Sequence, residues 1–337
     1  MRRLSALLAT PAGRVARYLI SLALLVFLAA QVDWAQLAAA HNRISLPLVV
    51  VALLLIGITY PIQAARWWLL LRAQNIPLSF HWSHLVTWIG QFYNAFLLGG
   101  IGGDAARVYY LLRDAATQRA AGLATLVFDR ATGLLLLFAI PAVALTARTG
   151  AWAAEPGLRG LFFTASALTL GGIIFAVWLL RTDPPRWPTQ LQRIIGPARL
   201  ATAAQLLTCV RATPGAHAGA FLLGAVIWLL DFIAVWLLAR AIGLPLPFLE
   251  TCIAMSVAYA ATVLPISVGG HGIREGALLA TLAAFGLLAT VAAQNLAPLL
   301  ALLVWAVTVF WSLFGGLVVL AASRLLPPNS AAARPLP

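Results

Sequence analysis

The stretch "LPLVVVALLLIGITYPIQAARWWLL", from Leu46 to Leu70, decides the fold class of this chain. A helix of about 20 apolar residues crosses the hydrocarbon core of a bilayer, and this run meets that length. Of the 337 residues, 62% are hydrophobic and 9% are charged, a composition that no soluble domain of this size needs. The sequence predicts an all-α polytopic membrane protein with about seven or eight transmembrane helices and additional broken or re-entrant segments. The other expected spans are Tyr18 to Gln36, Ala120 to Ala147, Leu158 to Leu180, Ala216 to Ala239 and Leu296 to Ala321.

The basic residues restrict the function classes. They number 22, give a formal net charge of +13, and are all arginine. Because they are spread between apolar runs, we expect no binding of nucleic acid. The absence of lysine excludes a Schiff-base enzyme and a P-loop nucleotide site, whereas arginine can still recognise phosphate.

The cysteines Cys209 and Cys252 have the spacing of neither a zinc site nor a redox pair. His81 and His84 are expected on a short polar connection at the water interface, without a further ligand nearby. We therefore predict no metal and no cofactor.

The N-terminal segment allows two interpretations. Arginines precede an apolar stretch from Tyr18 to Ala30, and Ala38 to Ala40 resemble a signal-peptide cleavage site. Gln31 to Trp34 separate those alanines from the apolar stretch, and many spans follow. An uncleaved first span is the favoured interpretation.

Arginine placement predicts the orientation, because cytoplasmic loops carry an excess of basic residues. Arginines cluster before the first span, at the end of the second span and in the polar loop from Arg181 to Gly215. These regions, including the N-terminus, are expected on the cytoplasmic side, and the side of the C-terminus stays open.

The domain organisation is expected to be simple. Residues 1–325 form a single membrane domain with repeat halves of approximately 14–180 and 181–325, and residues 326–337 form a disordered tail. The polar loop is shorter than the roughly 40 residues at which a unit folds unaided, so no soluble domain is predicted.

Two apolar regions, His84 to Leu112 and Glu250 to Leu288, are interrupted by glycine and charge. The interruptions read "LLGGIGGDAARVYYLL" and "LPISVGGHGIREGALL". At an offset of 167 residues, glycines and an arginine coincide: Gly102 with Gly269, Gly103 with Gly270, and Arg107 with Arg274. Three expected crossings separate the two copies, which predicts an inverted repeat with a site near the midplane.

The interruptions predict an anion site. Glycines let the chain turn, and the helix that follows begins inside the protein with unpaired N–H groups. Arg107 and Arg274, one turn into these helices, add charge and donors suited to a lipid phosphate. A structural alternative stays open, in which Asp104 caps its helix and pairs with Arg107, and Glu275 pairs locally.

Asp129 and Arg130 lie at mid-depth in the run "VFDRATGLLLL". Neighbouring helical side chains point about 100° apart, so each needs a partner on another helix. We hypothesise one polar cluster of six residues, in which the arginines bind phosphate and the acids balance or couple to it: Arg107, Arg130, Arg274, Asp104, Asp129 and Glu275. Asp231 is a weaker candidate.

The segment from Gln63 to Phe80 is typical of a membrane interface. Trp67 and Trp68 would lie at the headgroup level, with Arg66 and Arg72 extending to water. Anchoring is the favoured role, and capture of lipid headgroups is the alternative.

In order, "RWWLLLR", "QFYNAFLLGGIGGDAARVYYL", "VFDRATGLLLL" and "LPISVGGHGIREGALL" resemble the flippase-like membrane domain of lysylphosphatidylglycerol synthases. The resemblance extends from about Arg14 to Ala321. The family motif has a proline where this chain has Leu98, four residues after Asn94. The resemblance implies a bacterial inner-membrane protein that handles lipids or polyprenyl-linked lipids, with hopanoid biosynthesis among the associations of its relatives. The aminoacyltransferase domain of the synthases is absent from this sequence, so we expect no enzyme activity.

The function that these features favour is translocation of a membrane lipid, anionic or polyprenyl-phosphate-linked. The alternative is a non-catalytic membrane partner or regulatory subunit of a lipid- or glycan-modifying enzyme. An intramembrane transferase using Asp104 or Asp129 as base is the least favoured, because no nucleophile and base set is evident.

Overall fold

The structure is a computed structural model that describes residues 44–96, 102–147, 149–150, 155–263 and 270–326. The expected first span, the glycine Gly269, the proline-equivalent Leu98 and residues 327–337 of the tail lie outside the described residues. All described secondary structure is helical, which confirms the predicted all-α class.

Five described helices are long and apolar enough to cross a membrane. They coincide with the expected spans to within a few residues at most ends: α4 (Leu46–Ala73), α7 (Arg119–Thr146), α9 (Pro156–Arg181), α12 (Pro214–Ala241) and α15 (Val291–Leu325). Their outward faces remain apolar, as in α9, where Leu170, Ile174 and Phe175 are 59%, 67% and 59% exposed. Exposed apolar side chains on long helices are what lipid contact requires.

The two interrupted regions form pairs of short helices, as expected. The first pair is α5 (Phe80–Phe96) with α6 (Gly102–Asp114), and the second is α13 (Phe248–Ala261) with α14 (Ile273–Ala284). The two helices of each pair pack against each other. Each helix is shorter than the roughly 20 residues that cross a bilayer core. The breaks therefore place helix ends, with their polar groups, inside the bundle.

The expectation of a polar loop from Arg181 to Gly215 is wrong. This segment folds into η2 (Pro184–Arg186), α10 (Thr189–Ile195) and α11 (Pro197–Ala212). Pro184 and Pro197 occupy the first turn of η2 and α11, where the missing proline N–H costs no hydrogen bond. The prolines therefore start helices here instead of indicating a loop.

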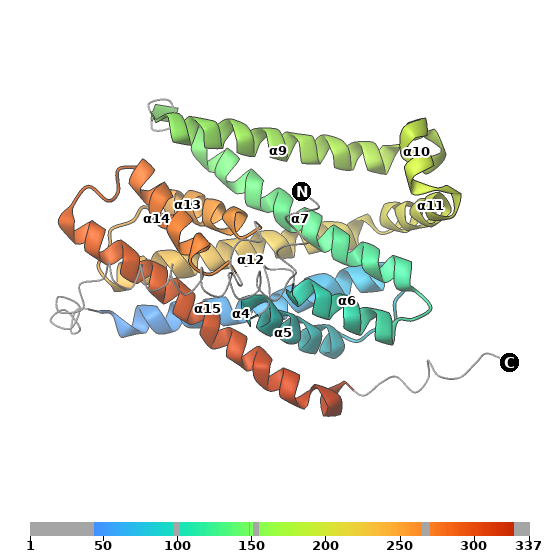
Figure 1. The fold of residues 1–337 in the computed structure, drawn as a ribbon, viewed down its shortest axis with the longest axis horizontal. Coiled ribbons are helices and arrows are strands. Elements are labelled where there is room, and N and C mark those ends of the chain that lie inside the picture. The colour runs from blue at the N-terminus through green and yellow to red at the C-terminus, as the bar shows by residue number, and fades with distance from the viewer. Residues whose placement is uncertain (1–43, 97–101, 148, 151–154, 264–269, 327–337) are drawn as a thin grey trace, which may run out of the picture.

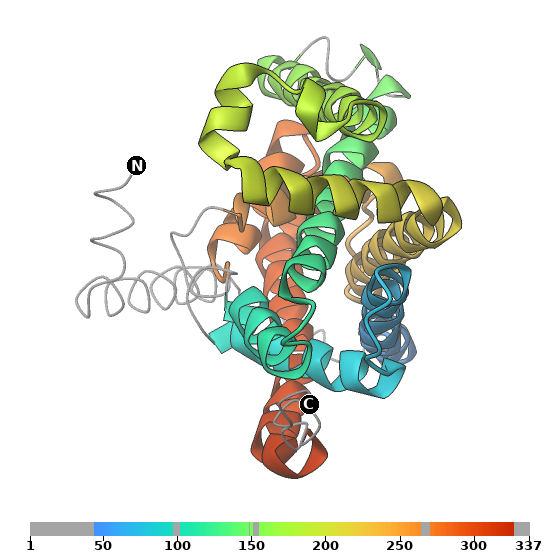
Figure 2. The same ribbon diagram turned by 90° about the vertical axis from the view of Figure 1, so that its right-hand side faces the viewer.

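Helices α4 and α12 lie side by side and run antiparallel along the length of the molecule (Figure 1). The Ser45 N–H before α4 donates to the Ala241 carbonyl at the end of α12, at 2.9 Å. At the other end of the pair, Gly219 of α12 faces the Leu69 side chain of α4. Helix α9 lies at the periphery on α7, and α10 and α11 close one end (Figure 2).

The two larger apolar cores of the described residues both include residues of α4. The larger lies between α4, α12, α13 and α15 and includes the fully buried Phe232, Met255 and Leu300. The smaller joins α4, α5 and α6 around Trp67 and Leu111. Each broken helix pair is thus held by its own core.

A second internal similarity is visible in the turns that follow α4 and α12. The segments "WLLLRAQNIPLSF" (Trp68 to Phe80) and "WLLARAIGLPLPF" (Trp236 to Phe248) lie 168 positions apart. In both, the Trp Nε1–H donates to a Leu carbonyl ten residues later, at 3.2 and 3.0 Å, and the fifth residue, an arginine, stacks on that tryptophan. Both turns also place one residue at positive φ, Asn75 and Gly243. The starts of α4 and α12, and of α5 and α13, differ by the same 168 positions.

Candidate functional site

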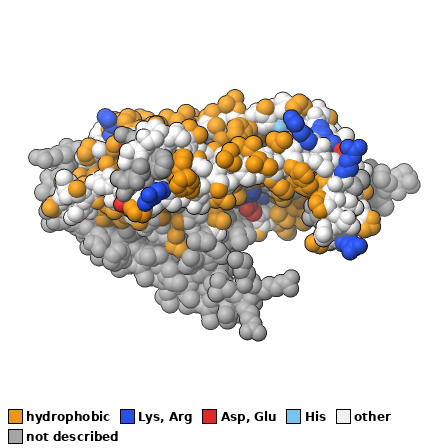
Figure 3. All heavy atoms as spheres, turned by 90° about the horizontal axis from the view of Figure 1, so that it is seen from above, with side chains coloured by type: hydrophobic (Ala, Val, Ile, Leu, Met, Phe, Trp, Pro, Cys, Tyr) orange, Lys and Arg blue, Asp and Glu red, His pale blue; other side chains and the backbone are white. Residues whose placement is uncertain are grey.

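A cavity of about 340 Å³ lies between the central helices and both broken pairs. Its lining comes from α4, α5, α6, α7, α12, α13, α14 and α15. Seen from above in Figure 3, charged side-chain atoms are visible between the hydrophobic side chains of the surface. Apolar residues complete the wall, among them Leu134, Leu137, Ile227 and Val263.

The cavity wall carries charges of both signs, and two of its arginines are ion-paired with Asp104 or Glu275. Four arginines and two aspartates line it. These residues are Arg66, Arg107, Arg130, Arg274, Asp129 and Asp231. Arginine retains its charge in apolar surroundings and presents a planar set of donors, so this wall suits an anion.

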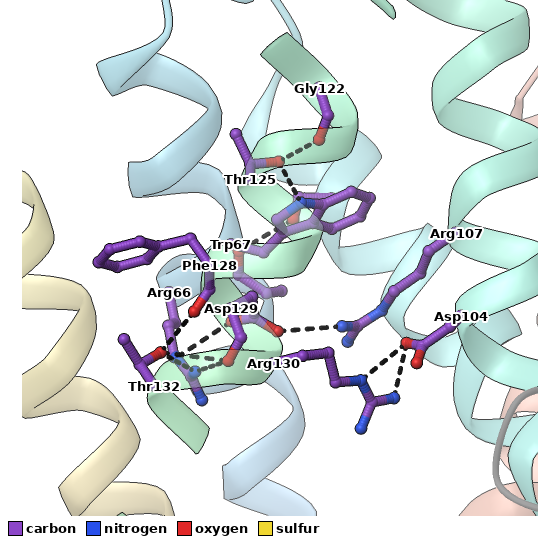
Figure 4. A network of polar contacts seen from close by, with 12 residues as sticks. Arg66, Trp67, Asp104, Arg107, Gly122, Thr125, Phe128, Asp129, Arg130 and Thr132 are labelled. Atoms are coloured by element: carbon purple, nitrogen blue, oxygen red, sulfur yellow. Dashed lines mark hydrogen bonds and ion pairs between the residues drawn. The ribbon is translucent and has the colours of Figure 1, made fainter. Parts of the chain in front are cut away.

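Asp129 of α7 is the centre of the first charged group (Figure 4). Its carboxylate lies 3.1 Å from Arg66 Nε and 3.4 Å from Arg107 NH1, and all three side chains are at most 12% exposed. Arg66 also donates to the Asp129 carbonyl and, at 2.7 Å, to Thr132 Oγ1. One carboxylate thus serves two guanidinium groups, and the group retains a positive charge.

Arg130 does not pair with its neighbour Asp129 but with Asp104 of α6 (Figure 4). Its Nε and NH2 donate to Asp104 Oδ1 at 2.9 and 2.6 Å, and the two side chains are 50% and 33% exposed. Asp129 and Arg130 therefore find their partners on other helices, as the helical geometry predicted. Asp104 pairs with Arg130 and not with Arg107.

Arg274 and Glu275 form a separate group at the start of α14. Arg274 Nε and NH2 donate to Glu275 Oε1 at 2.9 and 2.6 Å, and Arg274 NH1 donates to Thr308 of α15. Glu275 Oε2 accepts the Gly272 N–H at 2.7 Å. The six residues expected in one cluster thus divide into separate ion-paired groups, which share a cavity but not direct contacts.

The glycines act differently in the two breaks. A Cβ on Gly103 would lie 2.4 Å from the Gly90 carbonyl oxygen, so this glycine permits close approach of α5 and α6. Gly270 has a φ of +76°, the left-handed conformation that the expected turn requires, and Gly102 is the first residue of α6.

The helix N-termini at the breaks are partly occupied already. Asn94 Oδ1 accepts the Gly103 N–H at 2.9 Å, and Glu275 accepts that of Gly272. These N–H groups are not free for a ligand. Of the donors that the sequence interpretation assigned to an anion, the arginine side chains line the cavity, whereas these helix-end N–H groups are already bonded.

Arg66 is the residue that the sequence interpretation missed. It was expected to extend to water at the interface, but it is 7% exposed and lines the cavity. Trp67 beside it is fully buried, donates to Thr125 Oγ1 and lies under the Arg107 guanidinium. Nothing local in "RWWLLLR" distinguishes a buried arginine from an interfacial one, because its partner Asp129 lies on another helix.

Asp231 of α12, a weaker candidate in the sequence, is also part of the cavity wall. Its Oδ2 accepts the Tyr259 hydroxyl of α13 at 2.7 Å. Tyr60 and Trp228 line the same part of the wall.

Among the described histidines, His271 lines the cavity, and its Nε2 lies 3.1 Å from the Ala95 carbonyl oxygen. His81, His84 and Cys252 are not part of the lining. His81 and His84 lie within helix α5, not on a connection, and His84 Nε2 accepts the Trp88 indole N–H. Cys252 is a buried free thiol. Within the described part of the chain, no group of three or more potential ligands is arranged around a metal ion.

These features define a polytopic helical membrane protein with a charged cavity between two broken helix pairs. The chain belongs to the family described as the lysylphosphatidylglycerol synthase TM region, whose sequence profile matches residues 14–315. No curated protein and no solved structure matches the chain significantly.

Proposed function

We propose that this protein translocates a membrane lipid whose headgroup is anionic or carries a polyprenyl-linked phosphate. The observation that carries the proposal is the cavity, where four arginines meet an apolar wall. Phosphate oxygens fit guanidinium donors, and Leu134, Leu137, Ile227 and Val263 offer surface to hydrocarbon chains. The chain would thus act as a transporter and not as an enzyme.

The proposal includes an inverted repeat of the units α4–α7 and α12–α15. The matching Trp-Arg turns and the antiparallel course of α4 and α12 support it. In an inverted repeat, one unit can rock against the other and expose a midplane site to either side. The repeat would give the lipid alternating access to the two leaflets.

We further propose that the protein lies in the bacterial inner membrane with a cytoplasmic N-terminus. Several arginine-bearing segments meet at one end of the molecule, where α11 bonds to the segment after α9 and α7 begins beside the end of α4. Figure 3 shows basic side chains gathered at that end. Such an excess is typical of a cytoplasmic face.

The second candidate is a membrane subunit that docks a lipid- or glycan-modifying enzyme. Helix α9 favours it, because this helix packs mainly on α7 and is the least buried of the five long described helices. Recovery of one enzyme partner with the wild type, lost on polar substitution of Ile174 and Phe175, would support this candidate.

Reconstitution in vesicles tests the translocase. Fluorescent phosphatidylglycerol and a fluorescent polyprenyl phosphate are placed in both leaflets, and the fraction accessible to a membrane-impermeant quencher is followed over time. We expect movement with the wild type, its loss in Arg107→Gln, and wild-type movement in Arg211→Gln, which removes an arginine of α11. Absence of movement with folded wild-type protein would contradict the proposal.

A further inference from the structure

Asp231 differs from the other acids beside the cavity. Asp104, Asp129 and Glu275 each form an ion pair with an arginine. Asp231 accepts one hydrogen bond, from Tyr259, and among the described residues no basic side chain lies within 4 Å of it. A lone carboxylate at membrane depth is costly, so it needs a cation or a proton.

The surroundings of Asp231 favour a proton over a bound cation. The groups that face it are Tyr60 of α4, Tyr259 of α13 and, at longer range, Arg274 of α14. Arg66 and Arg130 lie elsewhere on the same wall, beside Asp129. A metal ion would require several oxygen ligands, and a cationic headgroup would meet the Asp129 group, in which two arginines share one carboxylate.

The internal similarity places a neutral residue at the position of the first unit that matches Asp231. Gln63 of α4 lies 168 positions before Asp231 and occupies the equivalent place in its helix. Its side-chain amide lies near Thr59 Oγ1 and also lines the cavity. A neutral, hydrogen-bonding side chain of similar length is thus accommodated at this position of the unit.

Resting on the function proposed above, we propose that Asp231 is the proton-binding residue that couples lipid movement to a proton gradient. An anionic phosphate held by the arginines repels the carboxylate in the same cavity and favours its protonation. By linkage, protonation of Asp231 strengthens anion binding by the same factor. The carboxylate takes one proton from water on one side and releases it on the other, and no bond in the lipid changes. The lipid anion and the proton cross together.

The test compares initial rates of fluorescent phosphatidylglycerol movement in vesicles across a pH series and under an imposed pH gradient. Wild-type rates should rise as the pH falls, by up to about tenfold per pH unit where the carboxyl titrates. Asp231→Asn should keep movement down a lipid gradient but lose the dependence on pH and on the proton gradient. Asp183→Asn, a matched change of an acid outside the spans, should behave as wild type.

Each outcome separates the two proposals. Wild-type movement with an unchanged pH dependence in Asp231→Asn would overturn proton coupling and leave the translocase intact. No movement by the wild type would contradict both. Fluorescent phosphatidylethanolamine serves as a second probe. If Asp231→Asn stops the movement of this lipid but not that of phosphatidylglycerol, Asp231 binds a cationic headgroup, which would overturn its role as proton carrier.

A second variant and a second measurement test the proposal even if Asp231→Asn does not fold in vesicles. Tyr259→Phe removes the hydrogen bond that stabilises the ionised carboxylate, so the midpoint of the pH profile should move to higher pH. Infrared difference spectra of the purified protein should show a protonated carboxyl band on addition of short-chain phosphatidylglycerol. That band should be absent from folded Asp231→Asn, and its persistence would contradict the assignment.

Discussion

Arg107 and Arg274 follow the glycine motifs of the two broken segments by the same number of residues, yet their surroundings differ. Arg107 shares Asp129 with Arg66, so that two guanidinium groups face one carboxylate. Arg274 has Glu275 to itself and a further bond to Thr308. The first group keeps an excess positive charge, whereas the second is neutralised from within its own helix. On the proposed function, we expect Arg107 to serve binding and Arg274 to serve structure.

The largest expected effect follows removal of the shared carboxylate. Asp129→Asn leaves Arg66 and Arg107 buried without a counter-charge, which should destabilise the protein by about 3 to 5 kcal/mol. Asp104→Asn should cost about 1 kcal/mol or less, because the side chains of Asp104 and Arg130 are partly exposed. Unfolding by titration with sodium dodecyl sulfate measures both. Equal losses of stability in the two variants would show that the Asp129 carboxylate is no more important for folding than that of Asp104.

The next effect concerns how closely the first broken pair packs. Gly103→Ala places a methyl group against the Gly90 carbonyl and should cost about 1 to 3 kcal/mol. Gly276→Ala in α14 meets nothing within 4 Å and should stabilise its helix by up to about 1 kcal/mol. The same unfolding titration applies. A harmless Gly103→Ala would mean that α5 and α6 can separate without loss.

A smaller effect is expected at the second group. Thr308→Val removes one hydrogen bond to Arg274 while Glu275 remains, so the loss of stability should be about 1 kcal/mol. Lipid movement should persist in this variant. Loss of movement with normal stability would show that Arg274 takes part in binding.

The smallest effect lies outside the spans. A hydrogen bond from Arg211 lowers the pKa of Asp183 on the exposed segment after α9. Since the pKa is lowered in the folded state, the stabilisation is present above the ordinary aspartate pKa and is lost as pH falls through the lowered value. Proteolysis of this segment should therefore increase at acidic pH in the wild type and show little pH dependence in Arg211→Ala. The reverse pattern would contradict the contact.

The sequence alone predicts the helices because lipid contact imposes length and composition on them. The expected boundaries at Leu46, Ala120 and Leu158 lie within two residues of the observed starts, and both breaks lie at the glycine-rich motifs. The segment from Arg181 to Gly215 was predicted wrongly because proline at a helix start resembles proline in a loop.

The site was less predictable. Pairing depends on which helices become neighbours, so the contact of Arg66 with Asp129, 63 positions apart, has no local signal. The repeated Trp-Arg turns, by contrast, are readable in the sequence at a separation of 168 residues, although the glycine motifs alone do not reveal them. That alignment would also have matched Asp231 with Gln63 and shown that the two units differ there.

Binding of a soluble, short-chain phosphatidylglycerol to the purified protein tests the central claim most directly. Isothermal titration compares the wild type with Arg107→Gln and Arg274→Gln, each first shown to be folded. The charge excess beside Asp129 predicts that Arg107→Gln weakens binding by about tenfold or more, equivalent to about 1.4 kcal/mol, and that Arg274→Gln has a smaller effect. Absence of binding by the wild type, or equal losses in the two variants, would contradict the account.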